Sequence, residues 1–72
     1  METILEIIDF EKEEAKEILD EYLFDHNIKV DWCEAGAKRY YDDEENPHVK
    51  FTYKLFHDQE KEGKLKIKLQ KT

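Results

Sequence analysis

The feature that most constrains this chain is an apolar stripe repeated at the spacing of helical turns. The stripe recurs without a break at i, i+3, i+4, i+7, i+8 and i+11, namely at Ala15, Ile18, Leu19, Tyr22, Leu23 and His26. It predicts one amphipathic helix that starts within the stretch Asp9–Glu21. Asp9 is the expected N-cap, and Asn27 suits the left-handed residue that ends a helix. We expect the apolar face of this helix to pack on a sheet formed by the rest of the chain.

The segment before this helix fits two structures. Thr3 and Glu6 match a capping box, which would make one long helix from Ile4. Against that, charged residues stand where the apolar stripe from Ile4 would continue. The segment is short and rich in isoleucine, as buried strands are. We therefore favour a strand at Thr3–Ile8 that precedes the helix.

The last third of the chain has the alternation expected of strands. In His48–Phe56 the apolar and aromatic residues alternate with polar ones, and the same holds in Lys64–Gln70. The polar positions are mostly lysines. A polar loop of hairpin type, His57–Gly63, separates the two predicted strands.

The middle of the chain has weaker signals. Ile28–Cys33 alternates as a half-buried strand does, and Lys38–Asp42 is a candidate further strand. Between them Ala35–Ala37 has the composition of a turn or bulge, and Asp43–Pro47 is a loop. The sum is a single α+β domain over residues 1–72, with one amphipathic helix packed on an antiparallel sheet of three to five strands. The expected order is strand, helix, strand, an optional strand, and two final strands.

Composition narrows the class of protein. A single cysteine allows no internal disulfide, which favours a reducing location in the cytoplasm. The sequence has neither the apolar stretch of a signal peptide nor an apolar run long enough to span a membrane. Four Tyr, four Phe and one Trp supply core-forming side chains that disordered chains lack.

Charge is divided unevenly along the chain. The net charge is −7; residues 1–45 hold 16 of the 19 acidic side chains, whereas residues 46–72 hold 7 of the 12 basic ones. An acidic surface repels phosphates and lipid headgroups and attracts cationic surfaces. We therefore expect a basic protein partner. The same charge disfavours a membrane partner and direct nucleic-acid binding.

The motifs that carry catalysis or metal binding are missing from the sequence. The histidines and Cys33 match no zinc spacing, and His48 and His57 would face opposite ways in one strand. There is no serine-nucleophile motif and no glycine-rich phosphate loop. Cys33 is expected to be a small buried side chain. We expect a non-enzymatic protein with no cofactor, no metal and no catalytic residue.

Two acidic stretches supply the candidate binding residues. One is the outward face of the predicted helix, and the other follows a tyrosine pair; together with Tyr40, the candidates are Glu13, Glu14, Glu17, Asp20, Glu21, Asp42, Asp43, Glu44 and Glu45. Carboxylates one helical turn apart form a row of negative charge on a scale comparable to that of a nucleic acid backbone. Of the adjacent Tyr40 and Tyr41, one is expected to point into the core.

By these carboxylates the chain resembles small acidic inhibitors, including phage-encoded DNA mimics and bacterial immunity or antitoxin proteins. The resemblance is one of composition. It implies a protein that blocks a DNA-binding host protein or a nuclease by presenting a DNA-like surface, in the cytoplasm of a bacterial host if the chain is phage-encoded.

Three other interpretations stay open. The acidic helix face is also what a solvated, solubilising surface would look like. The chain could instead be a dimeric interaction module that binds through a sheet edge and exposed tyrosines. Finally, the lysines of the last two strands could protect a sheet edge, pair with the acidic helix face of a second copy, or contact nucleic acid weakly; these are Lys50, Lys54, Lys64, Lys66 and Lys68.

Overall fold

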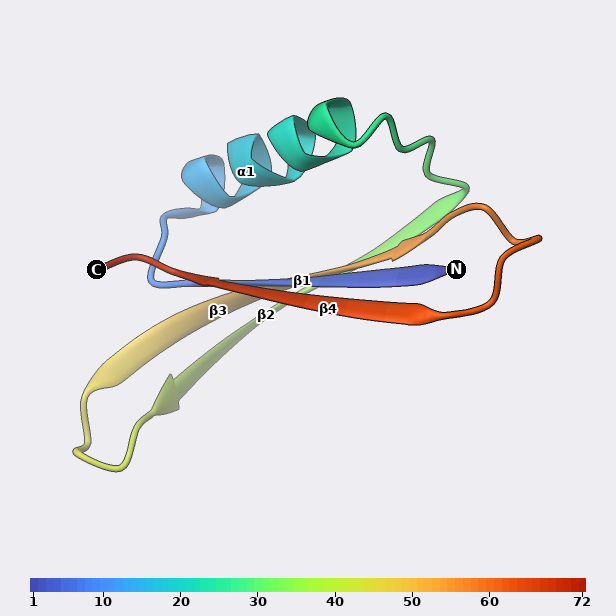
Figure 1. Cartoon of the computed structure of the whole chain (residues 1–72). Helices are drawn as coiled ribbons and strands as arrows, with labels where there is room; N and C mark the ends of the chain where they lie inside the picture. The colour runs from blue at the N-terminus through green and yellow to red at the C-terminus, as the bar shows by residue number, and fades with distance from the viewer.

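The computed structural model describes all residues, 1–72, as a helix lying across one face of a four-stranded sheet (Figure 1). The elements are β1 (Glu2–Ile8), α1 (Lys12–Asp25), β2 (Trp32–Tyr41), β3 (Pro47–Phe56) and β4 (Lys64–Gln70). The order in the sheet is β2-β3-β1-β4. The predicted α+β fold is thus confirmed, with one helix and four strands. α1 is neither long nor apolar enough to cross a membrane.

β1 is a central strand, which confirms the strand prediction for Thr3–Ile8 and rules out the long helix. It pairs antiparallel with β3 and parallel with β4. Every residue from Thr3 to Ile8 is buried. Ile4 and Ile8 point to the face opposite α1 and are nonetheless buried, so β1 needs apolar residues at consecutive positions, which explains its isoleucines.

The predicted hairpin between the last two strands is wrong. β3 and β4 are not neighbours, because β1 lies between them. Residues 57–63 therefore carry the chain past the end of β1 to its other side, and this makes β4 parallel to β1. The alternation of β3 and β4 predicted two strands correctly but contained no information about which strand each one pairs with.

The middle of the chain forms one strand and not two. β2 runs without interruption from Trp32 to Tyr41, so neither the break at Ala35–Ala37 nor a strand at Ile28–Asp31 exists. Gly36 is extended and pairs with Thr52 of β3. Small residues are compatible with an extended strand here because nothing packs above β2, whose residues are exposed except for Tyr40.

The helix starts later than predicted. Its N-cap is Glu11, with extended backbone (φ −72, ψ 158), and the Glu14 carboxylate accepts a hydrogen bond from the Glu11 N–H at 3.3 Å. Asp9, the expected N-cap, instead has φ 65 in the turn after β1, and its carboxylate contacts β3. At the other end Asn27 has φ 50, as predicted for the residue that ends the helix.

The core lies between α1, β1 and β3. Leu5, Ile7, Ala15 and Leu55 form its buried centre. Partly buried residues of the predicted helical stripe pack around them, namely Ile18, Leu19, Tyr22 and Leu23. His26, the last residue of that stripe, is exposed and stacks on Tyr22 with 4.1 Å between ring centroids.

Two predictions about the core are wrong. Cys33 is exposed rather than buried. Neither tyrosine of the adjacent pair is in the core, since Tyr40 is half-buried and Tyr41 is 74% exposed. Both errors have one cause: α1 packs over β1 and β3 and leaves β2 uncovered.

Candidate binding surface

The outward face of α1 is a stripe of unpaired carboxylates with one aromatic side chain in it. Glu13, Glu17, Asp20 and Glu21 are all exposed, and none of them forms an ion pair. Phe24 is 86% exposed. At about 100° per residue, Phe24 points in the same direction as Glu13, Glu17 and Asp20. The helix therefore presents an apolar group at the C-terminal end of an acidic row.

Phe24 was missed by the sequence reasoning, although a signal for it was available. It follows Asp20 by four residues and lies outside the apolar stripe that packs on the sheet. Aromatic residues are enriched at protein interfaces and charged residues are depleted at their centres, so an exposed Phe24 on the solvated face is a candidate contact.

Glu14 belongs to a different contact. Both of its carboxylate oxygens lie 3.2 Å from the Lys71 Nζ. The hydrogen bonds from Lys71 and from the Glu11 N–H hold the pKa of Glu14 below its ordinary value. Glu14 thus ties the first turn of α1 to the residues after β4 and is not part of the free acidic row.

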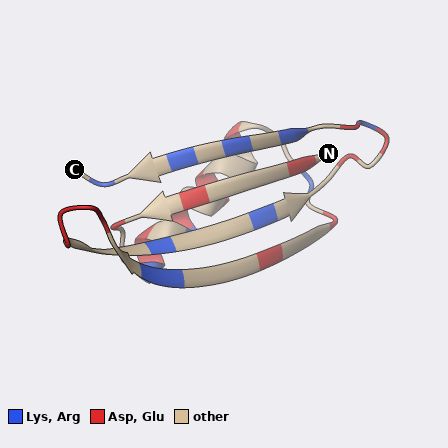
Figure 2. Cartoon of the chain, turned by 90° about the horizontal axis from the view of Figure 1, so that it is seen from below, with Lys and Arg blue, Asp and Glu red and all other residues tan.

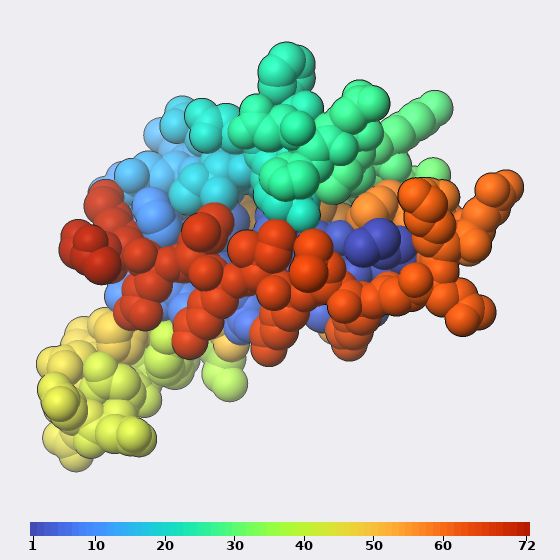
Figure 3. Space-filling view, in the orientation of Figure 1, coloured from blue at the N-terminus to red at the C-terminus, as the bar shows by residue number.

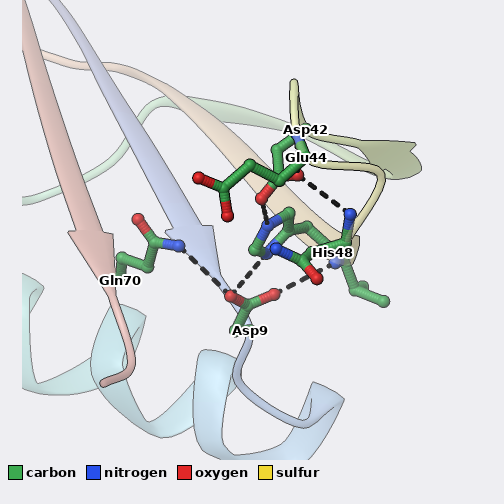
Figure 4. Close-up of polar contacts among 7 residues, drawn as sticks. Asp9, Asp42, Glu44, His48 and Gln70 are labelled. Atoms are coloured by element: carbon green, nitrogen blue, oxygen red, sulfur yellow. Dashed lines mark hydrogen bonds and ion pairs between the residues drawn. The ribbon is translucent and has the colours of Figure 1, made fainter.

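Asp42 is also engaged within the molecule (Figure 4), and so is Tyr40. Asp42 Oδ2 lies 2.9 Å from His48 Nε2, and its Oδ1 accepts hydrogen bonds from the N–H groups of Glu44 and Asn46. These contacts, His48 first, lower the pKa of Asp42 to about 2. The Tyr40 ring stacks on His48, with 5.2 Å between centroids.

The remaining acidic candidates, Asp43, Glu44 and Glu45, are exposed in the turn between β2 and β3. This turn projects away from the body of the molecule, on the side of the sheet opposite α1 (Figures 1 and 3). The two acidic stretches are therefore not brought together into one face. Of the two, only the α1 stretch combines its carboxylates with an exposed apolar side chain.

Near the start of α1 a groove of about 540 Å³ lies between the helix, the β2–β3 hairpin and the end of the chain. Its walls include Phe10, Arg39, Tyr41 and Lys71, together with the Asp9–His48 pair. No serine, threonine or cysteine lines it. Nor does the molecule hold a group of three His, Cys, Asp or Glu side chains arranged to bind a metal ion.

The face of the sheet opposite α1 carries most of the lysines (Figure 2). Glu6 of β1 lies between Lys50, at 3.0 Å, and Lys66, at 2.9 Å. Hydrogen bonds from Lys66 and Lys50 lower the pKa of Glu6. Lys64 lies 3.8 Å from Glu2, so several lysines of this face neutralise glutamates of β1.

The same sheet face has an aromatic pair at one end. Trp32 is 60% exposed and stacks on Phe56, with 5.1 Å between ring centroids. Lys54 and Lys68 lie on this face, the former beside Phe56 along β3, and neither forms an ion pair. The surface is thus a second candidate, of opposite charge to the α1 face.

Comparisons with protein families, with curated proteins and with solved structures found no match to this chain. Its function has therefore to be proposed from its own surfaces.

Proposed function

We propose that this chain is a non-catalytic acidic binding protein that uses the outward face of α1 to occupy a cationic groove on a protein partner. DNA-binding proteins and nucleases carry such grooves, and occupancy by an acidic helix would inhibit them by excluding nucleic acid. The observation that supports this most is the exposure of Phe24, at 86%, within a row of unpaired carboxylates. An exposed phenylalanine adds nothing to solubility, whereas aromatic residues are enriched at protein interfaces.

The two kinds of side chain have separate tasks in this proposal. The carboxylates at Glu13, Glu17 and Glu21 attract a positive surface over a distance and raise the association rate. Phe24 then enters an apolar pocket in the partner and slows dissociation, as buried aromatic anchors do at the centre of protein interfaces. The turn Asp43–Glu45 is too far from this face to contribute to the same contact.

The experiment starts with the tagged chain as bait in a cell lysate, washed at low and at high salt, with bound proteins identified by mass spectrometry. The expected partner is a basic protein that is retained at low salt and released at high salt, because exposed charges are screened within about 10 Å at 0.1 M salt. Affinity for the purified partner is then measured for E13K/E17K/E21K and for F24A.

The matched control is D43K/E44K/E45K, which changes the net charge by the same amount at the other acidic stretch. We expect the α1 triple variant to abolish binding, F24A to weaken it about tenfold or more, and the turn variant to bind nearly as well as the unchanged protein. Equal losses in the two triple variants would show that net charge alone matters, and unchanged affinity in the α1 variant would contradict the proposal.

The lysine-bearing sheet face supports a second candidate function, binding of single-stranded nucleic acid. Its supporting observation is exposed Trp32, stacked on half-buried Phe56 beside Lys54, which lacks an ion-pair partner, since bases stack on aromatic rings next to positive charge. Trp32 is the only tryptophan, so an oligonucleotide that stacks on it would quench the intrinsic fluorescence. Quenching that K54E/K68E removes would support this candidate; no quenching at low salt would end it.

A further inference from the structure

β2 is an outer strand of the sheet with no structural protection along its free edge. It forms one border of the sheet, and no other element lies beside it (Figure 2). Its ten residues contain no proline and no residue with positive φ, so the strand is neither broken nor bulged by these. The centre, Ala35-Gly36-Ala37, has small side chains that obstruct neither face. Natural proteins usually block such an edge, because its free N–H and C=O groups can pair with another strand.

The opposite border of the sheet is blocked by like charge. β4 has Lys64, Lys66 and Lys68 on one face. Pairing of β4 with its own copy about the midpoint, Ile67, would place Lys66 opposite Lys68, and like charges directly opposite each other are destabilising. The two outer strands of the sheet therefore differ: like charges oppose pairing at β4, and only β2 is open to a partner.

We propose that β2 pairs antiparallel with β2 of a second copy of this chain, about a two-fold axis at Gly36. In this register the numbers of two facing residues add up to 72. Glu34 therefore lies opposite Lys38 of the second copy, and Lys38 lies opposite Glu34 of the second copy. Both residues are exposed, and neither forms an ion pair within the chain. The dimer gives Lys38 the oppositely charged cross-strand neighbour that it lacks within the chain, and gives Glu34 a second one besides Lys54, twice by symmetry.

The same register pairs the uncharged side chains suitably. On the open sheet face Trp32 lies opposite Tyr40 of the second copy, and aromatic cross-strand pairs stabilise antiparallel sheets. On the helix side Ala35 lies opposite Ala37. The intrachain neighbour of Lys38 is Lys50, an unfavourable pair that Glu34 of the second copy would offset.

Other symmetric registers lack this complementarity. A two-fold axis perpendicular to the sheet leaves every side chain on its original face of the sheet. Two facing residues must therefore lie on the same face, so the axis can pass only at a residue and never between two. An axis at Ala37 leaves Lys38 opposite Gly36, and one at Ala35 leaves Glu34 opposite Gly36. An axis at Glu34 or at Lys38 places like charges on each other. The axis at Gly36 alone matches Glu34 with Lys38.

The dimer would have one continuous eight-stranded sheet with both copies of α1 on the same side. Two acidic helix faces would then point in one direction, and a partner with two cationic sites could engage both with increased avidity. Pairing of β2 with its copy does not depend on the proposed function, because it involves only the free edge of β2.

The first test is the mass of the chain in solution, measured by sedimentation velocity between about 1 µM and 1 mM. Pairing of two short strands is a small interface, at the low end of the roughly 1,200–2,000 Å² of stable complexes, so we expect a concentration-dependent dimer of twice 8.8 kDa. K38E places Glu opposite Glu34 of the second copy, and should weaken dimerisation about tenfold or more. Within the chain K38E gives Lys50 an oppositely charged neighbour, so the variant should remain folded. E34K/K38E restores both cross-copy pairs and should restore the dimer.

The second test fixes the register. Gly36 has space for a side chain, since a Cβ there would meet no atom within 4 Å. C33S/G36C should form a disulfide-linked dimer under mild oxidation, because the two introduced cysteines face each other across the axis. In C33S/A35C the two cysteines would be about 8 Å apart, two residues along the strand and one strand across, which is too far for a disulfide. A monomer at all concentrations, a dimer indifferent to K38E, or equal cross-linking of the two cysteine variants would each overturn the proposal.

Discussion

Nδ1 of the His48 ring lies 2.7 Å from Oδ2 of Asp9, a bond that joins the turn after β1 to β3 across 39 residues of chain. The other ring nitrogen contacts Asp42 at 2.9 Å. Ionised carboxylates only accept hydrogen bonds, so both ring nitrogens must donate, and His48 is held as an imidazolium. Its hydrogen bonds to Asp42 and then Asp9 raise the pKa of His48, while His48 lowers the pKa of both aspartates.

These shifts predict a stability optimum that depends on His48. The aspartates, with ordinary pKa values of 3.8, stabilise the fold above that pH, and their contribution is lost as the pH falls toward the pKa of about 2 that Asp42 has in the fold. His48 stabilises the fold fully below its ordinary pKa of 6.5, and this contribution is lost as the pH rises through its raised pKa. The cluster should therefore stabilise the fold most between about pH 4 and 6.5.

The measurement is urea unfolding from pH 3 to 9, with H48Q compared with the unchanged protein. The difference in unfolding free energy between the two should be largest near pH 5 to 6 and shrink on both sides. H26Q is the control, because exposed His26 contacts only the Tyr22 carbonyl and ring. A difference that stays constant with pH would contradict the imidazolium assignment, as would a His48 resonance that titrates below pH 6.5 in an NMR experiment.

The start of α1 offers a stabilising substitution. Glu11 occupies the N-cap with suitable extended backbone, and Glu14 already bonds to its N–H. Glu11 and Glu14 already form a capping box, but serine is a better N-cap than glutamate because its short side chain reaches the N–H groups of the first turn with less loss of side-chain freedom. E11S should raise the unfolding free energy by about 0.5–1 kcal/mol, measured by urea or thermal unfolding. E11A is the control and should give no gain.

Hydrophobic periodicity was sufficient to predict α1, β3 and β4, because each of them has one distinct apolar face, whereas β1 was predicted from its short run rich in isoleucine. The period of Ile18, Leu19 and Tyr22 can be satisfied only by a helix, and the alternation around Phe51 and Ile67 only by strands. It could not show the order of the sheet, because a strand with a regular apolar face packs equally well beside β1 or beside β3. The insertion of β1 between β3 and β4 is a long-range pairing that leaves no local trace.

The errors at β2 and at the candidate site share a physical origin. β2 is uncovered, so its central Ala35-Gly36-Ala37 needs no large side chains and resembles a turn when only composition is considered. The carboxylates of Glu14 and Asp42 were grouped with the free acidic residues, because sequence does not show that Lys71 and His48 reach them. Phe24 was not predicted as a binding residue because the prediction for this helix face rested on its charged residues alone.

Glu6 is buried and should contribute more to stability than the exposed or partly exposed glutamates. It is 9% exposed and lies between Lys50 and Lys66. E6Q keeps the shape but removes the charge that both lysines contact, and should lower the unfolding free energy by about 1–3 kcal/mol. The loss should shrink in 1 M NaCl, because salt screens the pairs. E60Q, at an exposed position with no ion pair, should change the unfolding free energy by less than about 0.5 kcal/mol. If E6Q and E60Q lowered it equally, the ion pairs of Glu6 would not contribute to stability.

A comparison of two apolar residues separates folding from binding. Leu5 is 1% exposed at the centre of the core, so L5A should lower the unfolding free energy by about 2–5 kcal/mol through lost burial and the cavity it leaves. A 72-residue domain has only about 4–11 kcal/mol in total at the usual stability per residue, so much of the L5A variant would be unfolded at 37 °C.

F24A, in contrast, should change the unfolding free energy by less than about 0.5 kcal/mol, because Phe24 is 86% exposed and packs on nothing that is buried. Urea unfolding of both variants beside the unchanged protein checks the pair. If F24A destabilised the fold by 2 kcal/mol or more, Phe24 would have a structural task in solution, and its loss could no longer be used to test the binding face. A stable F24A variant that has lost its partner would instead place the contact on the outward side of α1, because the fold that presents Glu13 and Glu17 would be intact.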